Sequence, residues 1–233
     1  MNSTTLRGLA FVPLLLFSLM SAGCLDSDFD EPPTEFVLNA TPVGENERFE
    51  LEGDELQINS ITFAVNNIEV TASGENEIFE PTPIPVRMNA ADMTGLTRMG
   101  VAELFGGDYT GVKMDLIVPP TDGSVNVPEL IDEDDNGNIE NVHSVVITGR
   151  YNSLAFSISS DREEVLEFSF DRTITMPETD GVLEVTLVSE WRQWFTSSGG
   201  DRLLDPDIPE DRDEILDNFT RFFTAETFTL NEL

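Results

Sequence analysis

The segment Leu56–Val70, LQINSITFAVNNIEV, constrains the fold more than any other part of the chain. It is rich in β-branched and apolar residues that alternate with polar ones, the period of a strand that buries one face. The alternation changes phase twice, at Asn59-Ser60 and at Asn66-Asn67. A β-bulge or a tight turn at each place would explain the change. The run therefore predicts a long strand region with two local irregularities.

The same alternation recurs in shorter segments along the rest of the chain. The clearest are Val112–Val118, Ser153–Ser159, Leu166–Phe170 and Leu183–Val188. Further strands are expected at Glu35–Ala40, Arg48–Leu51, Ile84–Met88, Ser144–Arg150 and Thr173–Met176. Turn signals spaced by about 8–15 residues are typical of antiparallel sandwiches and barrels. We predict a mainly all-β fold, an antiparallel β-sandwich.

Two segments predict helices. Asp211–Phe223 carries five apolar residues on one stripe, and its first residues are acidic, which complements the helix dipole. We expect it to be a short amphipathic helix that covers one open end or face of the sandwich, rather than a helix that binds a partner or lies on a membrane. A second helix is predicted at Asp92–Phe105, interrupted by Gly95 and Gly100.

The first residues predict export and lipid attachment. Leu9–Met20 is a 12-residue apolar run, too short for the roughly 20 residues that span a bilayer and suited to a signal peptide. Ser21-Ala22-Gly23-Cys24 follows and contains the only cysteine, so no disulfide can form within the chain. This tetrapeptide resembles the lipobox of bacterial lipoproteins, in which the thiol is diacylated and the chain is cut before it. Ser21 departs from the Leu preferred there, and the alternative is an ordinary secretory signal followed by a free cysteine.

These features divide the chain into three parts. Residues 1–23 are expected to be a cleaved lipoprotein signal peptide that targets the bacterial cell envelope, with Cys24 as the lipidated residue. Residues 24–34 are acidic and contain proline, and we expect a solvated tether. Their charge also resembles the surface-export signal of some outer-membrane lipoproteins, so the domain could face the periplasm or the cell surface. Residues 35–233 are expected to form a single β-sandwich domain that includes the helix at 211–223.

The charge balance excludes one class of partner. The chain has 45 Asp and Glu against 12 Lys and Arg, which gives a formal net charge of −33. A charge of this sign repels phosphate-rich polymers, so a nucleic-acid binder is excluded. Lys113 is the only lysine. Acidic, lysine-poor surfaces are typical of proteins that work at high salt, where self-repulsion is screened.

One motif has the spacing of a metal site. Asp132–His143, DEDDNGNIENVH, matches a twelve-residue calcium loop when Gly137 takes position six. The expected calcium ligands are then Asp132, Asp134, Asn136, the backbone carbonyl of Asn138, and Glu140 through a water molecule. Position twelve is His143 instead of a bidentate Glu, and imidazole is a poor calcium ligand. The motif predicts weak Ca²⁺ binding, with an acidic surface hairpin as the alternative.

Motifs for catalysis are scarce. His143 is the only histidine, so a zinc site with several histidines is excluded and a catalytic triad would have to use this residue. Among 45 acidic residues, a pair of carboxylates in the sequence carries no information about hydrolysis. The sequence favours a protein that is not an enzyme.

Two clusters of side chains are expected to pack in the core. The first cluster consists of Met88, Met93 and Met99. Their thioethers could bind copper, but their spacing in the sequence does not place them on one face of a helix, which favours packing in the core. The second cluster consists of Trp191, Trp194 and Phe195. Exposed at the rim of a sandwich, these rings could stack on sugars, but we expect them to seal the core.

Several segments resemble a known group of proteins. NSITFAVNNIEV, PVRMNAADMTGL and GDYTGVKMDLIV are similar to a recurrent domain of secreted bacterial proteins. VVITGRYNSLAFSI, LEFSFDRTITM, VTLVSEWRQWF and the helical RLLDPDIPEDRDEILDNFTRFF resemble acidic lipoproteins that end in a short helix. The resemblance covers most of Glu35–Phe223. It implies an uncharacterised bacterial lipoprotein family with an immunoglobulin- or transthyretin-like sandwich, and it implies no chemistry.

We therefore expect a lipid-anchored cell-envelope protein whose sandwich binds a protein or glycan partner. Two alternatives belong to other classes: a structural or assembly subunit or spacer of an envelope complex, and a carboxylate-dependent hydrolase. A contiguous exposed aromatic patch would favour binding, and a concave pocket with two facing acids would favour hydrolysis.

Overall fold

The computed structural model describes residues 34–42, 48–72, 76–80, 82–89, 97–104, 107–176, 181–189, 191–221 and 223–232. All of these residues belong to the unit Glu31–Leu233. The predicted signal peptide, Cys24 and residues 25–33 of the predicted tether lie outside the described residues.

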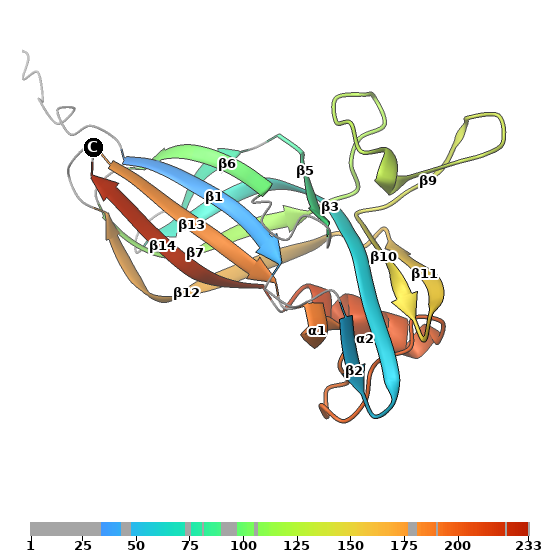
Figure 1. Ribbon diagram of the computed structural model, residues 1–233. Helices are drawn as coiled ribbons and strands as arrows, with labels where there is room; N and C mark the ends of the chain where they lie inside the picture. The colour runs from blue at the N-terminus through green and yellow to red at the C-terminus, as the bar shows by residue number, and fades with distance from the viewer. Residues whose placement is uncertain are drawn as a thin grey trace, which may run out of the picture. The chain divides into compact units, whose positions relative to one another are not determined.

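A first sheet contains four strands in the order β14-β13-β1-β6 (Figure 1). Their bounds are β1 Thr34–Pro42, β6 Thr97–Leu104, β13 Gly181–Ser189 and β14 Phe223–Glu232. β1 pairs with β13 in parallel, and the other two pairs are antiparallel.

A second sheet contains eight strands in the order β11-β10-β3-β7-β12, with β2, β4 and β5 also paired to β3. Their bounds are β2 Arg48–Leu51, β3 Asp54–Ala72, β4 Asn76–Glu80, β5 Ile84–Asn89, β7 Gly107–Leu116, β10 Val145–Tyr151, β11 Leu154–Ser160 and β12 Glu164–Met176. Every pair in this sheet is antiparallel. A separate hairpin joins β8 Ile131–Glu133 to β9 Ile139–Val142, after the short 3₁₀ helix Pro128–Leu130.

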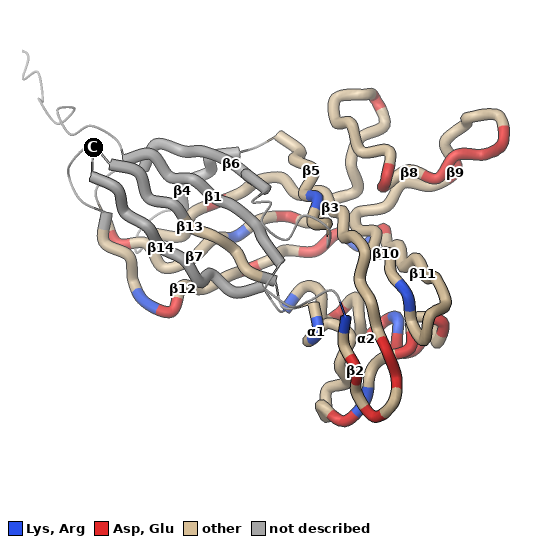
Figure 2. The backbone as a smooth tube through the Cα atoms, viewed as in Figure 1, with Lys and Arg blue, Asp and Glu red and all other residues tan. Residues whose placement is uncertain are grey.

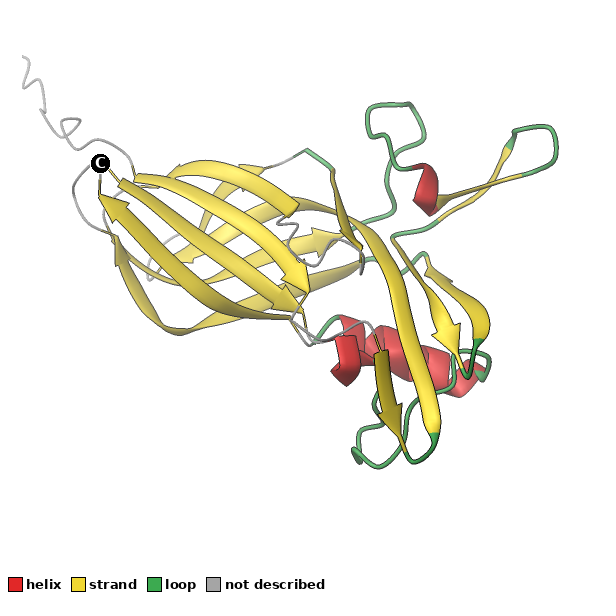
Figure 3. Ribbon diagram, viewed as in Figure 1, coloured by secondary structure: helices red, strands yellow, loops and turns green. Residues whose placement is uncertain are grey.

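The two large sheets face each other and share one core (Figure 3). Leu187 of β13 and Phe168 of β12 belong to the same buried cluster, and β12 and β14 run close together at one flank. The prediction of a mainly antiparallel, sandwich-like all-β fold is confirmed.

The 19-residue strand β3 organises the second sheet. One edge of β3 pairs in turn with β2, β5 and β4, and the other edge pairs with β10 and then β7. The exchange from β10 to β7 occurs at Ala64, whose N–H donates to the carbonyl of Ser144 and whose carbonyl accepts the N–H of Ile117, both at 3.0 Å. Both backbone groups of Ala64 are therefore paired at this crossing point, which is what lets two strands share one edge.

Both phase changes in β3 are β-bulges. Pairing with β10 skips Asn59, and pairing with β7 skips from Asn66 to Glu69. Asn67 takes a positive φ of 46°, a conformation that asparagine tolerates better than most residues. Each bulge adds a residue without a partner, so the apolar positions on either side of it stay on the core face. At the first bulge a Cβ on Gly149 of β10 would overlap the carbonyl oxygen of Gln57, so only glycine fits there.

The middle of β3 is buried on both faces. Ile61 and Phe63 belong to the main core between the sheets. Ala64 belongs to a second, smaller cluster with Val127 and Leu130 from the segment around the 3₁₀ helix. Covering both faces explains why five consecutive residues of this strand, 61–65, are buried.

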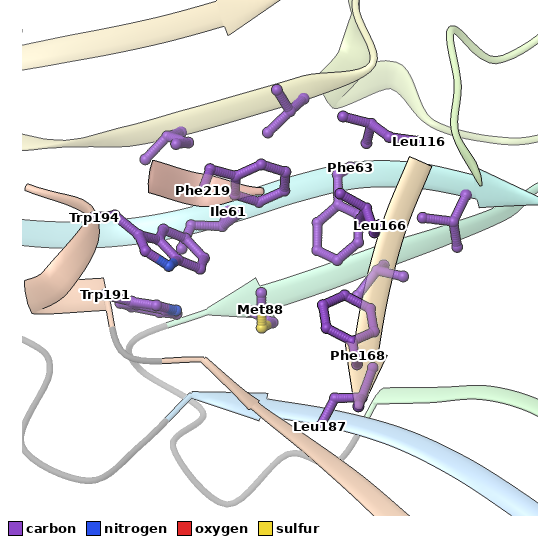
Figure 4. Close-up of a cluster of buried hydrophobic side chains, with 14 of the residues drawn as sticks. Ile61, Phe63, Met88, Leu116, Leu166, Phe168, Leu187, Trp191, Trp194 and Phe219 are labelled. Carbon is purple, nitrogen blue, oxygen red and sulfur yellow. The ribbon is translucent and has the colours of Figure 1, made fainter. Parts of the chain in front are cut away.

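Two short helices cover one end of the second sheet. Helix α1 spans Trp191–Trp194 and helix α2 spans Pro209–Phe219. Phe219 packs edge-on against Phe63 at 5.4 Å and against Trp194 at 5.0 Å between ring centroids (Figure 4). The prediction of a helix that covers an open end of the sheets is confirmed.

The bounds of the predicted C-terminal helix need correction. The helix ends at Phe219, and Phe223 already pairs with Ser189 as the first residue of β14. The apolar residues that follow alternate with polar ones, and their backbone groups complete the edge of the first sheet instead of another helical turn.

The prediction of a helix at Asp92–Phe105 is wrong for the part that is described. Thr97–Leu104 is strand β6, antiparallel to β1, with Gly100 opposite Leu38. Glycine disfavours a helix interior by about 1 kcal/mol relative to alanine, and the open edge of β1 offers the segment a full set of backbone partners. Tertiary pairing therefore overrides a weak helical pattern.

We predict that Phe219→Ala destabilises the fold by about 3–5 kcal/mol, because it removes a buried ring that joins α2 to β3. Val165→Ala is the matched control: Val165 is 53% exposed and should change stability by less than about 0.5 kcal/mol. Denaturant unfolding monitored by tryptophan fluorescence measures both. Equal costs for the two variants would show that α2 is not part of the cooperative core.

Candidate functional site

The predicted calcium loop folds as a hairpin turn between β8 and β9. Oδ1 of Asp134 accepts the backbone N–H groups of Asn136 and Asn138, both at 2.8 Å, and Oδ2 accepts the side-chain amide of Asn138 at 2.8 Å. These hydrogen bonds lower the pKa of Asp134 to about 2, the Asn138 side chain contributing most. Gly137 allows the turn with a φ of 78°.

Three of the predicted ligands, Asp134, Asn136 and Asn138, are therefore hydrogen-bonded to one another. Asp132 contacts Nε2 of His143 across the hairpin at 2.9 Å, and the carbonyl of Asn138 accepts the N–H of Asp134 at 2.8 Å. Glu140 is exposed on β9. Figure 2 shows the concentration of acidic residues on this hairpin. Among the described residues, no group of three or more His, Cys, Asp or Glu side chains is arranged to hold a metal ion. Calcium binding stays a prediction, and it would require Asp134 to exchange amide donors for the ion.

The aromatic cluster after β13 is part of the core. Trp191, Trp194 and Phe195 have 0% exposure, so they cannot stack on a sugar from solvent. The expectation that they seal the core is confirmed. Met88 is also buried in the core, whereas Met93 and the side chain of Met99 lie outside the described residues.

A pocket lined by polar residues and two glycines lies at the exposed side of α1. Its volume is about 500 Å³, within the range of small-molecule sites. It is lined by Arg192, Gln193, Thr196, Ser197, Ser198, Gly199, Gly200, Asn218 and Arg221. No residue in this lining is an aliphatic or aromatic one, and none is acidic. Sequence reasoning missed it, because the lining comes from α1, the loop after it and the end of α2.

The floor of this pocket is held rigidly. The buried side chain of Asn218 donates to the carbonyl oxygens of Trp194 at 3.1 Å and Thr196 at 3.3 Å, which ties the end of α2 to the end of α1. Thr196 and Leu203 form a β-bridge that closes the loop between them. A pocket with a fixed floor loses little conformational entropy when a ligand binds.

A bidentate ion pair fastens the same loop to α2. Arg202 donates to both carboxylate oxygens of Asp211 at 2.6 Å, and the N–H of Asp205 donates to Asp211 at 2.9 Å. The Arg202 guanidinium, with this N–H, holds the pKa of Asp211 below its usual value and outweighs the opposing effect of burial. Nearby, burial and then a hydrogen bond with Asp54 raise the pKa of Tyr151 above its ordinary range.

A second pocket lies on the outer face of the β3–β7–β12 sheet, at the Asn66-Asn67 bulge. Its volume is about 370 Å³, and three of its lining residues are the acids Asp115, Glu163 and Glu164. Asp115 accepts the side-chain amide of Asn67 at 2.8 Å, while Oδ1 of Asn66 is buried with no hydrogen-bond partner among the described residues. The sequence indicated the bulge but not the acids around it, which are brought together by neighbouring strands.

No protein-family model, no curated protein and no solved structure matches the chain. Within the described ranges no helix has the length and apolar character needed to cross a membrane.

We predict that Asp134→Ala speeds hydrogen exchange at the amides of Asn136 and Asn138. In the wild type this protection should persist at pH 3, because the pKa of Asp134 in the folded state is about 2. Because folding lowers the pKa of Asp134, its ionised form stabilises the folded state fully above pH 3.8, the ordinary pKa of aspartate. This stabilisation is lost as the pH falls through about 2. Asp122→Ala is the control, since Asp122 caps another exposed turn through Ser124. Unchanged exchange in Asp134→Ala would contradict the capping role.

The same variant decides the calcium prediction. Calcium at millimolar concentration should raise the thermal midpoint of the wild type more than magnesium does at equal ionic strength, and Asp134→Ala should abolish the difference. Diffuse screening would act alike for both ions. A wild type that responds equally to both would identify the segment as a hairpin turn only.

We also predict that Asp211→Ala costs about 2–3 kcal/mol, because it leaves Arg202 and the Asp205 N–H without their acceptor. The contribution of the Arg202–Asp211 pair to the free energy of unfolding is complete above pH 3.8, the ordinary pKa of aspartate. It is lost as the pH falls below 3.8 toward the lowered pKa of Asp211. Asp213→Ala is the control: Asp213 is 72% exposed and should cost less than about 1 kcal/mol. Equal urea midpoints for the two variants would contradict a special role for Asp211.

Proposed function

We propose that the chain is a lipid-anchored cell-envelope protein whose sandwich domain binds a protein or glycan partner without converting it. The observation that carries this proposal is the pocket formed by α1, the loop that follows it and the end of α2. It combines a ligand-sized volume, a fixed floor and two arginines, Arg192 and Arg221, at its rim. Hydrogen-bond donors held on a fixed base are what a binding site needs.

The anchor is proposed from the sequence. Cys24 is the only cysteine and follows an apolar run and the three small residues Ser21, Ala22 and Gly23. The stretch that follows is acidic, and a charged, proline-containing stretch would hold the domain away from an anionic lipid surface. We propose that the domain faces either the periplasm or the outside from the outer membrane. The segment resemblances support a place among uncharacterised bacterial lipoproteins with an immunoglobulin- or transthyretin-like sandwich.

The pocket at the Asn66-Asn67 bulge favours a second candidate function, a carboxylate-dependent hydrolase. Asp115, Glu163 and Glu164 line one open cavity, the arrangement from which an acid and a base or nucleophile could act on a glycosidic bond. Hydrolysis of a panel of aryl glycosides that is lost in Glu164→Gln and in Asp115→Asn would establish this candidate. Absence of hydrolysis by the wild type would remove it.

We predict that Cys24→Ala moves the protein from the detergent-requiring membrane fraction to the soluble fraction, because covalent acyl chains are the only proposed attachment. Ser21→Leu, which restores the residue preferred before a lipidated cysteine, should leave the protein in the membrane fraction. Fractionation of cells expressing each variant, with mass spectrometry of the N-terminal peptide, measures this. Membrane retention of Cys24→Ala would contradict the anchor.

The binding role is tested by cross-linking intact cells that display the full-length protein. The wild type should capture a specific macromolecule that Arg192→Gln/Arg221→Gln captures less. If no macromolecule is captured by either, the chain is better described as a spacer or assembly subunit.

A further inference from the structure

The pocket is lined by two arginines, although the chain is strongly acidic. With 45 acidic residues present, a cation in this fold easily meets a carboxylate. The following cations lie within 4.0 Å of one: Arg48, Arg87, Lys113, Arg162 and Arg202. Within the described part of the chain, Arg192 and Arg221 form no such pair, yet both line one cavity. Two arginines that line one pocket in a chain of charge −33 indicate a site for a negatively charged group.

Two acids near the loop of the pocket bind other groups. Glu214 accepts the backbone N–H of Ser198 at 2.8 Å, and Asp201 accepts the hydroxyl of Ser197 at 2.8 Å. Neither acid lines the pocket. The guanidinium groups are therefore available to an external anion, and a planar carboxylate can accept two parallel N–H bonds from an arginine.

The remaining lining residues are uncharged: five have polar side chains and two are glycines. Gln193 is exposed beside Arg192 on α1, and the exposed Ser198 follows in the loop. An amide and a hydroxyl can each donate to and accept from sugar hydroxyls. A peptide partner would be expected to insert an apolar anchor, and an anionic lipid would insert acyl chains, but the lining contains no aliphatic or aromatic residue to receive either of them. The polar lining with two arginines fits a molecule that carries hydroxyls and an acid group on the same ring.

We infer that the Arg192–Arg221 pocket binds an acidic saccharide, a sugar whose carboxylate lies between the two guanidinium groups and whose hydroxyls contact Gln193 and Ser198. This inference rests on the proposed binding function and names its ligand class. The net charge of the chain repels the ligand at long range, but salt screens that repulsion beyond about 8 Å at physiological ionic strength. Recognition therefore depends on short-range contacts inside the pocket.

The test uses the folded full-length chain with Cys24→Ala, so that no detergent is needed, in buffer at about 0.15 M NaCl. A galacturonate trisaccharide is titrated by calorimetry and by ligand-observed NMR, against maltotriose as the neutral sugar and inorganic phosphate as the bare anion. We expect binding of the acidic trisaccharide, with at least about tenfold weaker binding of maltotriose and of phosphate.

The double variant Arg192→Gln/Arg221→Gln should bind the acidic trisaccharide at least about tenfold more weakly. Its thermal midpoint should be unchanged, because neither arginine has an ion pair to lose within the described structure. Arg150→Gln is the matched control. Arg150 is an exposed arginine of β10 without a carboxylate partner among the described residues, and it does not line the pocket. Its substitution should leave the affinity unchanged, although it also removes a positive charge.

Several results would overturn the inference. Equal affinity for maltotriose would show that the guanidinium groups do not select the ligand, and equal affinity for phosphate would identify a simple anion site. Equal weakening by Arg150→Gln would indicate only nonspecific attraction. Absence of acidic-sugar binding, together with a cross-linked partner that still depends on Arg192 and Arg221, would refute the ligand class and leave the proposed function standing.

Discussion

The hydrogen-bond ladder along β3 is the interaction on which the rest of the structure depends. This strand of 19 residues, about 60 Å of extended chain, carries five partner strands on its two edges. The half that pairs with β7 and β4 belongs to the sandwich, and the half that pairs with β2 and β10 lies beside the two helices (Figure 1). A strand this long can keep one face in a continuous core only if its twist and phase are corrected, and the two bulges provide that correction.

The position of the candidate site follows from this ladder. Phe63 of β3 packs on Phe219 of α2, and Phe219 packs on Trp194 of α1, so the strand sets where both helices lie. Asn218, next to Phe219, then joins α2 to the chain just after α1. The pocket is the outer surface of this packed layer. Its arginines are not needed as ion pairs, because hydrophobic packing and the Arg202–Asp211 pair already hold the helices in place.

Sequence reasoning located the elements better than the sites. Alternation identified most strands, and the phase changes at Asn59 and Asn66 coincide with both bulges of β3. The local pattern failed at Thr97–Leu104, where a weak helical signal yielded to the open edge of β1, and at the end of α2, where Phe223 entered β14. In both cases the deciding partner is far away in the chain, and a local pattern contains no information about it. The Asp134 turn shows the same limit: the spacing of a calcium loop and that of a side-chain-capped hairpin use the same residue types.

The sequence by itself determined the all-β class, the burial of the aromatic residues after β13 and the strongly acidic character of the chain. These properties depend on periodicity and composition, which are local or additive. Only the tertiary structure decided which cations are paired and which face a cavity. Arg192 and Arg221 are 29 positions apart, and they line one pocket because α2 folds back over α1. Side chains that meet through the packing of separate elements depend on the whole fold, so no pattern along the chain could have indicated this site.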